Sequence, residues 1–171
     1  MGEDPPGVRL ELVDGEIAVS PSPIPDHGFV ISALLRILGN HVEEYDLGQL
    51  FPDVDTIFGE FDVRRPDILF FSKSRLHLIG DKAMEGPPDL CIEVISPSSG
   101  KIDREDKLEQ YQQGGVANYW IVDPVPRILE AYQLKKKAYT LVGKGQGSAK
   151  LKLPPFPDLE IPLQKLWRLK K

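Results

Sequence analysis

Cysteine is nearly absent from this sequence, with Cys91 the only one among 171 residues. A single cysteine excludes a disulfide framework within the chain and favours a reducing compartment. Long apolar runs are also lacking, since none approaches the roughly 18 residues that a membrane-spanning helix needs. The first residues do not show the basic segment followed by an apolar one that is typical of a signal peptide. These absences predict a cytoplasmic protein with no membrane partner.

Positive charge is scarce as well. The 21 basic residues are outnumbered by 26 acidic ones, which gives a net charge of −5. Proteins that coat nucleic acids usually have a basic balance. Here the basic residues gather in short groups such as Arg64-Arg65 and Lys135-Lys136-Lys137, which are typical of a solvated surface. An anionic substrate would therefore have to be held by local groups or by metal ions.

The length predicts one domain spanning residues 1–171, large enough to bury a real core. Glycine and proline in residues 1–7 predict a flexible N-terminus. We place the core at about 8–145. Residues from about 146 to 171 are rich in proline, and we expect them to pack across the surface.

Local patterns predict the elements of the first half. Asp14-Gly15 separates two alternating segments, 8–13 and 16–19, which is a strong β-hairpin signal. A helix is expected over residues 27–46, capped by Asp26, because apolar residues recur there at a spacing of 3.6.

Further strands and a second helix follow along the chain. Residues 48–59 and 60–72 are typical of consecutive strands around a turn, and 73–88 of a loop. The later elements are an apolar strand at 89–95, a polar helix from Asp103 to Gly114, a strand at 118–123, and a hairpin joining 128–133 to 138–142.

Glu93 lies inside the apolar run of the strand at 89–95, where an ionised carboxylate is costly unless it has a partner. Asp67 lies in a similar setting, directly after Pro66 and before an apolar run. Two carboxylates from neighbouring strands form a hard oxygen site suited to Mg²⁺ or Mn²⁺, to which the backbone carbonyl of Val94 could add a ligand. Two alternatives stay open: Asp67 could cap the Arg64-Arg65 turn, and Glu93 could be paired with a buried arginine or lysine.

The polar helix carries Lys107 and Tyr111 on one face, with Asp103 one turn before. A helix that follows a metal-binding strand can bring an ammonium group back toward the metal. The alternative is a solvent-facing lysine that pairs with Asp103 or Glu109.

Three stretches, "LELVDGEIAVSPSP", "RRPDILFF" and "GPPDLCIEVISPSSGKIDREDKLEQYQQGGVANYWIVDP", together resemble the Uma-two family of putative restriction endonucleases, which is placed in the PD-(D/E)xK nuclease superfamily. The resemblance covers most of the chain and weakens after about residue 145. It implies an α/β (α+β) fold with a mixed central sheet flanked by helices, in the order α-β-β-β-α-β. An N-terminal and a C-terminal β-hairpin would complete this restriction-endonuclease-like fold.

The resemblance also implies roles for single residues. Pro66-Asp67 matches the PD element and Glu93 the second acidic ligand. The lysine expected two residues later is replaced by Ile95, so that Lys107 on the following helix is the matching position. The secondary candidates are Lys101 as a less favoured substitute, Tyr111 from the helix motif, and Glu11, Glu16 and His27, for which a turn or cap role is the simpler interpretation.

The activity that the resemblance implies is a DNA endonuclease dependent on Mg²⁺ or Mn²⁺, with a homodimer as a further expectation. The apolar tail "LPPFPDLEIPLQKLW" would either form the dimer interface or cover an edge of its own sheet. The alternative is a catalytically inactive module that binds DNA or a protein in defence or mobile-element biology. A small-molecule metallohydrolase is a third, weaker hypothesis.

Overall fold

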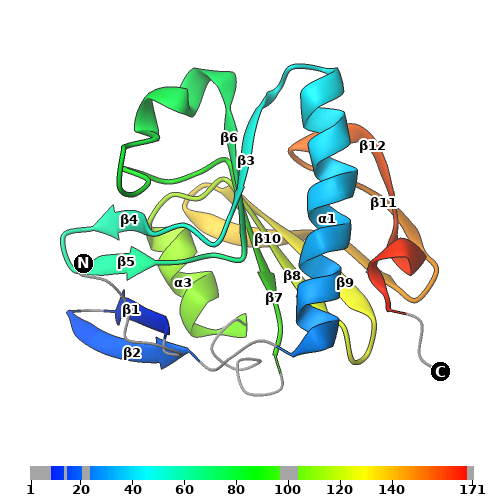
Figure 1. Cartoon of the computed structure of the whole chain (residues 1–171), viewed down its shortest axis with the longest axis horizontal. Coiled ribbons are helices and arrows are strands. Elements are labelled where there is room, and N and C mark those ends of the chain that lie inside the picture. Colours follow the sequence, from blue (N-terminus) through cyan, green and yellow to red (C-terminus); the bar gives the residue numbers. More distant parts are fainter. Residues whose placement is uncertain (1–8, 14, 21–23, 97–103, 169–171) are drawn as a thin grey trace.

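A six-stranded mixed sheet forms the centre of the structure, a computed structural model that describes residues 9–13, 15–20, 24–96 and 104–168 (Figure 1). Its strand order is β10-β9-β8-β7-β6-β3. The strands are β3 (Gly48–Pro52), β6 (Ile68–Ser72), β7 (Leu90–Val94), β8 (Asn118–Asp123), β9 (Ile128–Lys135) and β10 (Ala138–Gln146). Neighbouring strands are antiparallel except β7 and β8, which are parallel and are joined through α3 (Asp106–Gln113), as a parallel pair requires a crossover. The mixed sheet with helices on both sides confirms the predicted fold class.

Helix α1 (Pro25–Glu44) packs on one face of this sheet. The predicted start after an Asp26 cap is wrong, because the helix begins at Pro25 and its N-cap is Ile24, which makes no side-chain cap hydrogen bond. Proline is favoured at the first helical position, where its missing N–H costs no intrahelical bond. The Asp26 carboxylate instead accepts a hydrogen bond from Arg168 Nε at 2.6 Å.

A smaller four-stranded sheet has the order β2-β1-β5-β4. Its strands are β1 (Arg9–Val13), β2 (Glu16–Ser20), β4 (Thr56–Gly59) and β5 (Asp62–Arg64). The β1–β2 hairpin confirms the prediction from Asp14-Gly15. The prediction of one strand each for 48–59 and 60–72 is wrong, because both segments divide between the two sheets. Asp53 breaks the first segment with a positive φ of 56°, and Pro66 interrupts the second because it lacks an N–H for the ladder.

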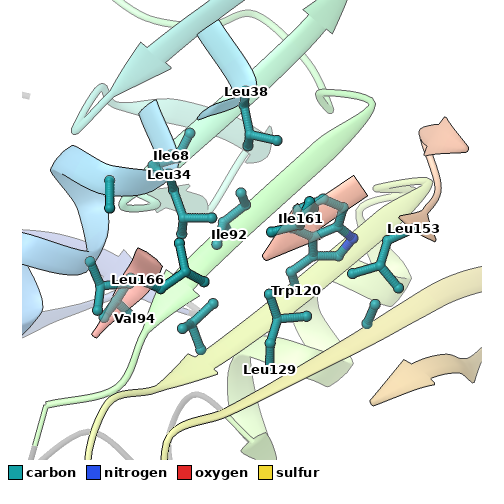
Figure 2. Packing of buried hydrophobic residues seen from close by; sticks show 14 of the residues in the cluster. Leu34, Leu38, Ile68, Ile92, Val94, Trp120, Leu129, Leu153, Ile161 and Leu166 are labelled. Carbon is teal, nitrogen blue, oxygen red and sulfur yellow. The ribbon is translucent and has the colours of Figure 1, made fainter. Parts of the chain in front are cut away.

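The C-terminal segment forms part of the core, which corrects the expectation of a surface segment and of a core ending near residue 145. It comprises β11 (Lys150–Leu153), β12 (Phe156–Pro162) and the 3₁₀ turn η2 (Leu163–Leu166). Figure 2 shows Leu153, Ile161 and Leu166 packed among side chains of α1 and the sheet. The prolines lie at the β11–β12 turn and at strand ends, so they leave the apolar positions free to face inward. The apolar tail thus covers a face of the sheet, and six of its large apolar side chains are already buried within the chain: Leu153, Phe156, Ile161, Leu163, Leu166 and Trp167.

The remaining segments differ less from expectation. The predicted loop over 73–88 contains a short 3₁₀ helix, η1 (Lys73–Leu78). Helix α3 ends at Gln113, followed by Gly114 as expected, whereas Asp103 lies outside the described residues. None of the helices described is both long and apolar enough to cross a membrane.

Candidate active site

Asp67 and Glu93 come from adjacent strands of the large sheet. Ile68 of β6 pairs with Ile92 of β7, and this antiparallel register places Asp67, just before β6, opposite Glu93. Residues directly opposite each other in such a pair have Cβ atoms about 4.5–5.5 Å apart and point to the same face. Both carboxylates are buried, and both lie on the face that α3 covers. The two carboxylates that the sequence singled out are therefore neighbours.

The surroundings of Asp67 favour its ionised form. Its Oδ2 atom lies 3.1 Å from His27 Nε2 and accepts a hydrogen bond of 2.8 Å from the backbone N–H of Val94. Burial raises the pKa of Asp67, but the hydrogen bond and charge of His27, the Val94 N–H and the positive charge of Lys107 together lower that pKa below its ordinary value. Asp67 thus bonds to His27 and Val94, whereas the N–H of Arg65 in the arginine turn donates to Glu11.

Glu93 receives two donors from one face of α3. Tyr111 Oη donates to Glu93 Oε1 at 2.6 Å, and Lys107 Nζ lies 2.9 Å from Glu93 Oε2. Burial and the negative charge of Glu93 raise the pKa of Tyr111 well above its ordinary value, so the phenol stays protonated and serves as a donor. Lys107 is buried and pairs with Glu93, and is not a solvent-facing lysine. The expected pairing of Glu93 with a buried cation is therefore present as well, with a lysine as the partner.

A second layer of polar side chains connects the small sheet to α3. Glu11 Oε2 accepts a hydrogen bond from an Arg64 terminal nitrogen at 3.2 Å, and Glu11 Oε1 accepts one from the Arg65 N–H at 3.1 Å. Arg64 Nε also donates to Gln110 Oε1 at 2.6 Å. Glu11 on β1 therefore links the small sheet's first strand to the Arg64-Arg65 segment. The expectation of a solvated surface at Arg64 is wrong, because Arg64 is buried. Sequence reasoning also missed Gln110, whose only signal was its place directly before Tyr111 on the same helix.

His27 reaches the site from the first turn of α1. Its side chain is buried, and its Nδ1 atom is a buried polar atom that has no hydrogen-bond partner. Buried polar atoms are rarely left unsatisfied, but this nitrogen is not the one that faces Asp67, which is contacted by Nε2. Helix-capping reasoning from the sequence did not foresee this contact with Asp67.

The other predicted site residues fall in two groups. Glu16 lies on β2 and is exposed. Lys101 and Asp103 lie outside the described residues. The part of the chain that the structure describes contains no group of three histidine, cysteine or acidic side chains placed to hold a metal.

A site of two carboxylates fits a hard cation that keeps part of its water shell. Mg²⁺ is usually bound through one or two carboxylates together with water, rather than by an all-protein cage. Asp67 and Glu93 supply that number of carboxylates. The donor set therefore suits Mg²⁺ or Mn²⁺ better than a four-ligand zinc site, which needs more protein ligands.

The chain is similar to known proteins in sequence and in fold. The chain is similar over 61% of its length, at 32% identity across 114 residues, to a D-2-hydroxyglutarate dehydrogenase from Pantoea ananatis (strain AJ13355), of which it spans only 11%. Its fold is similar to the crystal structure of "a putative nuclease belonging to DUF820" from Anabaena variabilis ATCC 29413. That structure has a TM-score of 0.76 at 20% identity, covering 92% of this chain and 89% of the other. Residues 2–164 match the family model described as "Uma2: Putative restriction endonuclease". Because that match covers almost the whole sequence, the chain belongs to the Uma2 family of putative restriction endonucleases.

Proposed function

We propose that this chain is an endonuclease that hydrolyses phosphodiester bonds in DNA with the help of Mg²⁺ or Mn²⁺. The observation that carries the proposal is the convergence of Asp67, Glu93 and Lys107 in one buried cluster. Family membership supports nuclease chemistry, and the pairing of two carboxylates with an amine is the side-chain set that such chemistry needs.

The cation would be held by Asp67 and Glu93, with the Val94 carbonyl as a further ligand. When bound, it would polarise the phosphate and lower the pKa of a bound water, so that hydroxide is available near neutral pH. The chain's own residues prepare this site. The His27 and Val94 contacts keep Asp67 ionised and fix the direction of its carboxylate, which a metal ligand requires.

Lys107 would act on the substrate. Its ammonium group lies beside Glu93, close enough to Asp67 for its charge to act there too. It would orient the attacking water or stabilise the negative charge that builds on the phosphate. Tyr111 would hold Glu93 through its protonated hydroxyl and take no proton itself.

The test combines metal binding with DNA cleavage. Supercoiled plasmid is incubated with Mn²⁺ and the wild type, Asp67→Asn or Lys107→Met, while Mn²⁺ affinity is measured by calorimetry. We expect Asp67→Asn to lose both metal binding and nicking, and Lys107→Met to keep metal binding while nicking falls at least 100-fold. Asp46→Asn, at an exposed carboxylate, is the control and should behave like the wild type. Nicking that survives Asp67→Asn would overturn the assignment.

A catalytically inactive binding module is the second candidate. It is favoured by the engagement of both Glu93 oxygens with Tyr111 and Lys107, which is also what a purely structural ion pair would show. The net charge of −5 points the same way. Metal binding without cleavage of double-stranded DNA, single-stranded DNA or RNA would support this candidate.

A further inference from the structure

The outer face of the small sheet is apolar across all four strands. Paired residues of an antiparallel sheet lie on the same face, and the register joins Ile17 to Leu12, Leu12 to Val63, and Val63 to Ile57. Leu10 pairs with Val19 two residues along the same strands. Phe61 extends this face at the β4–β5 turn, where its carbonyl accepts a hydrogen bond from the N–H of Gly15. We call these seven residues the outer apolar face: Leu10, Leu12, Ile17, Val19, Ile57, Phe61 and Val63.

The two faces of this small sheet are used differently. The inner face carries Glu11, Thr56 and Arg64, which are buried against the rest of the molecule. On the outer apolar face, by contrast, Ile17 is 71% exposed, Val19 66% and Phe61 60%. Its members join neither of the two clusters of buried apolar residues in the described part of the chain. Continuous exposed apolar surface of this kind marks an interaction site.

We propose that a second copy of this chain docks on the outer apolar face, so that two small sheets pack face to face about a two-fold axis. The strand positions of this face carry no charged side chain, so two copies meet there without like-charge repulsion, although each chain has a net charge of −5. A two-fold contact needs a self-complementary patch, and a face lined by Ile, Val, Leu and Phe is self-complementary. Two sheets packed in this way lie about 10 Å apart and interdigitate their side chains.

The size of the face sets the strength of the association. If a large apolar side chain exposes about 150–200 Å² when fully open, the outer apolar face offers about 500 Å² per copy. Two copies would then bury about 1,000 Å² in total, near the lower bound for a specific interface. The dimer should therefore be weak and depend on protein concentration.

The test is sedimentation velocity of the full chain from about 1 to 300 μM, the range suited to an association of this size. The variants are Ile17→Lys and Ile57→Lys, at opposite ends of the apolar row. Val125→Lys is the matched control, because Val125 is 73% exposed on the turn between β8 and β9, outside the small sheet. We expect the dissociation constant of the dimer to rise at least tenfold in both face variants and to stay unchanged in Val125→Lys.

Three outcomes would overturn this inference. One is a wild-type chain that stays monomeric up to the highest concentration. Another is a dimer that all three lysine variants weaken equally or not at all. The third is a dimer weakened by Ile17→Lys alone, since this would indicate pairing of the β2 edges rather than of the faces. Both substituted side chains are exposed, so thermal melting should show all variants folded. The sedimentation result does not depend on nuclease activity.

Discussion

The two faces of the large sheet differ in what holds them to the rest of the molecule. On the α1 face, Leu34, Trp120 and Ile161 belong to a cluster of apolar side chains that the C-terminal segment completes (Figure 2). On the α3 face, apolar side chains surround the buried charges of Asp67, Glu93 and Lys107. Burying charges is costly even when they are paired, whereas burying apolar groups is favourable. The apolar cluster on the α1 face thus stabilises the fold, whereas the buried polar cluster on the α3 face lowers the net stability.

The prediction with the largest expected effect on stability removes a side chain from the face of the sheet that α1 covers. Trp120 is fully buried, and its Nε1 donates to the carbonyl of Pro154 at 3.0 Å. We expect Trp120→Ala to lower the free energy of unfolding by about 3–5 kcal/mol, through the cavity that it leaves and the lost apolar burial. Urea denaturation measures the change, while the folded fraction should bind Mn²⁺ like the wild type. A loss below about 1 kcal/mol would contradict the role given to this face.

The next test breaks the ion pair on the α3 face. Lys107→Met leaves the Glu93 carboxylate buried without its ammonium partner, and we expect it to destabilise the protein by about 3 kcal/mol. The double variant Lys107→Met with Glu93→Gln removes both charges and should lie within about 1 kcal/mol of the wild type. Urea denaturation of the two single variants and the double variant forms a complete cycle. Additive losses would show that the two groups are not coupled.

A smaller effect on stability distinguishes a hydrogen bond to a charged acceptor from one to a neutral acceptor on the α3 face. Tyr111→Phe removes a bond to the ionised Glu93, which we expect to cost about 2 kcal/mol. Tyr139→Phe is the matched control, because Tyr139 donates to the neutral carbonyl of Val116 at 2.9 Å and should cost about 1 kcal/mol. Thermal and urea unfolding report both values. Equal losses would mean that Glu93 is not ionised in the folded protein.

The smallest effect concerns the dependence of stability on pH. The pKa of Asp67 is lowered in the folded protein from an ordinary value of 3.8. Its carboxylate therefore adds stability that is complete above pH 3.8 and is lost as the pH falls through the lower folded value. The difference in unfolding free energy between wild type and Asp67→Asn should shrink as the pH falls below 3.8. A difference that grows below pH 3.8 would mean that folding raises the pKa of Asp67 instead of lowering it.

The strands and helices of the large sheet were mostly predictable from sequence because their signals are local. The apolar run at 89–95 and the spacing in α1 each identify one element. The small sheet was only half predicted, because the partition of 48–72 between two sheets depends on Asp53 and Pro66 and on pairing with β1. The place of the C-terminal segment was missed, because its composition is proline-rich and β12 buries Phe156 and Ile161 without the regular alternation that identifies a strand.

The candidate site was predictable to the extent that its residues stand out chemically. Glu93 and Asp67 are charges beside apolar runs, and Lys107 and Tyr111 share a helical spacing. His27 and Arg64 were harder to place, because their contacts with Asp67 and Glu11 join elements 40 and 53 residues apart. Only tertiary packing decides which distant partners meet.

The C-terminal contribution to the core has a consequence for biosynthesis. Leu153, Phe156, Ile161, Leu163 and Leu166 all close the α1 face, so a nascent chain released only as far as β10 would leave that face open to water. The core on the α1 face can therefore be completed only after residues up to Leu166 have emerged from the ribosome.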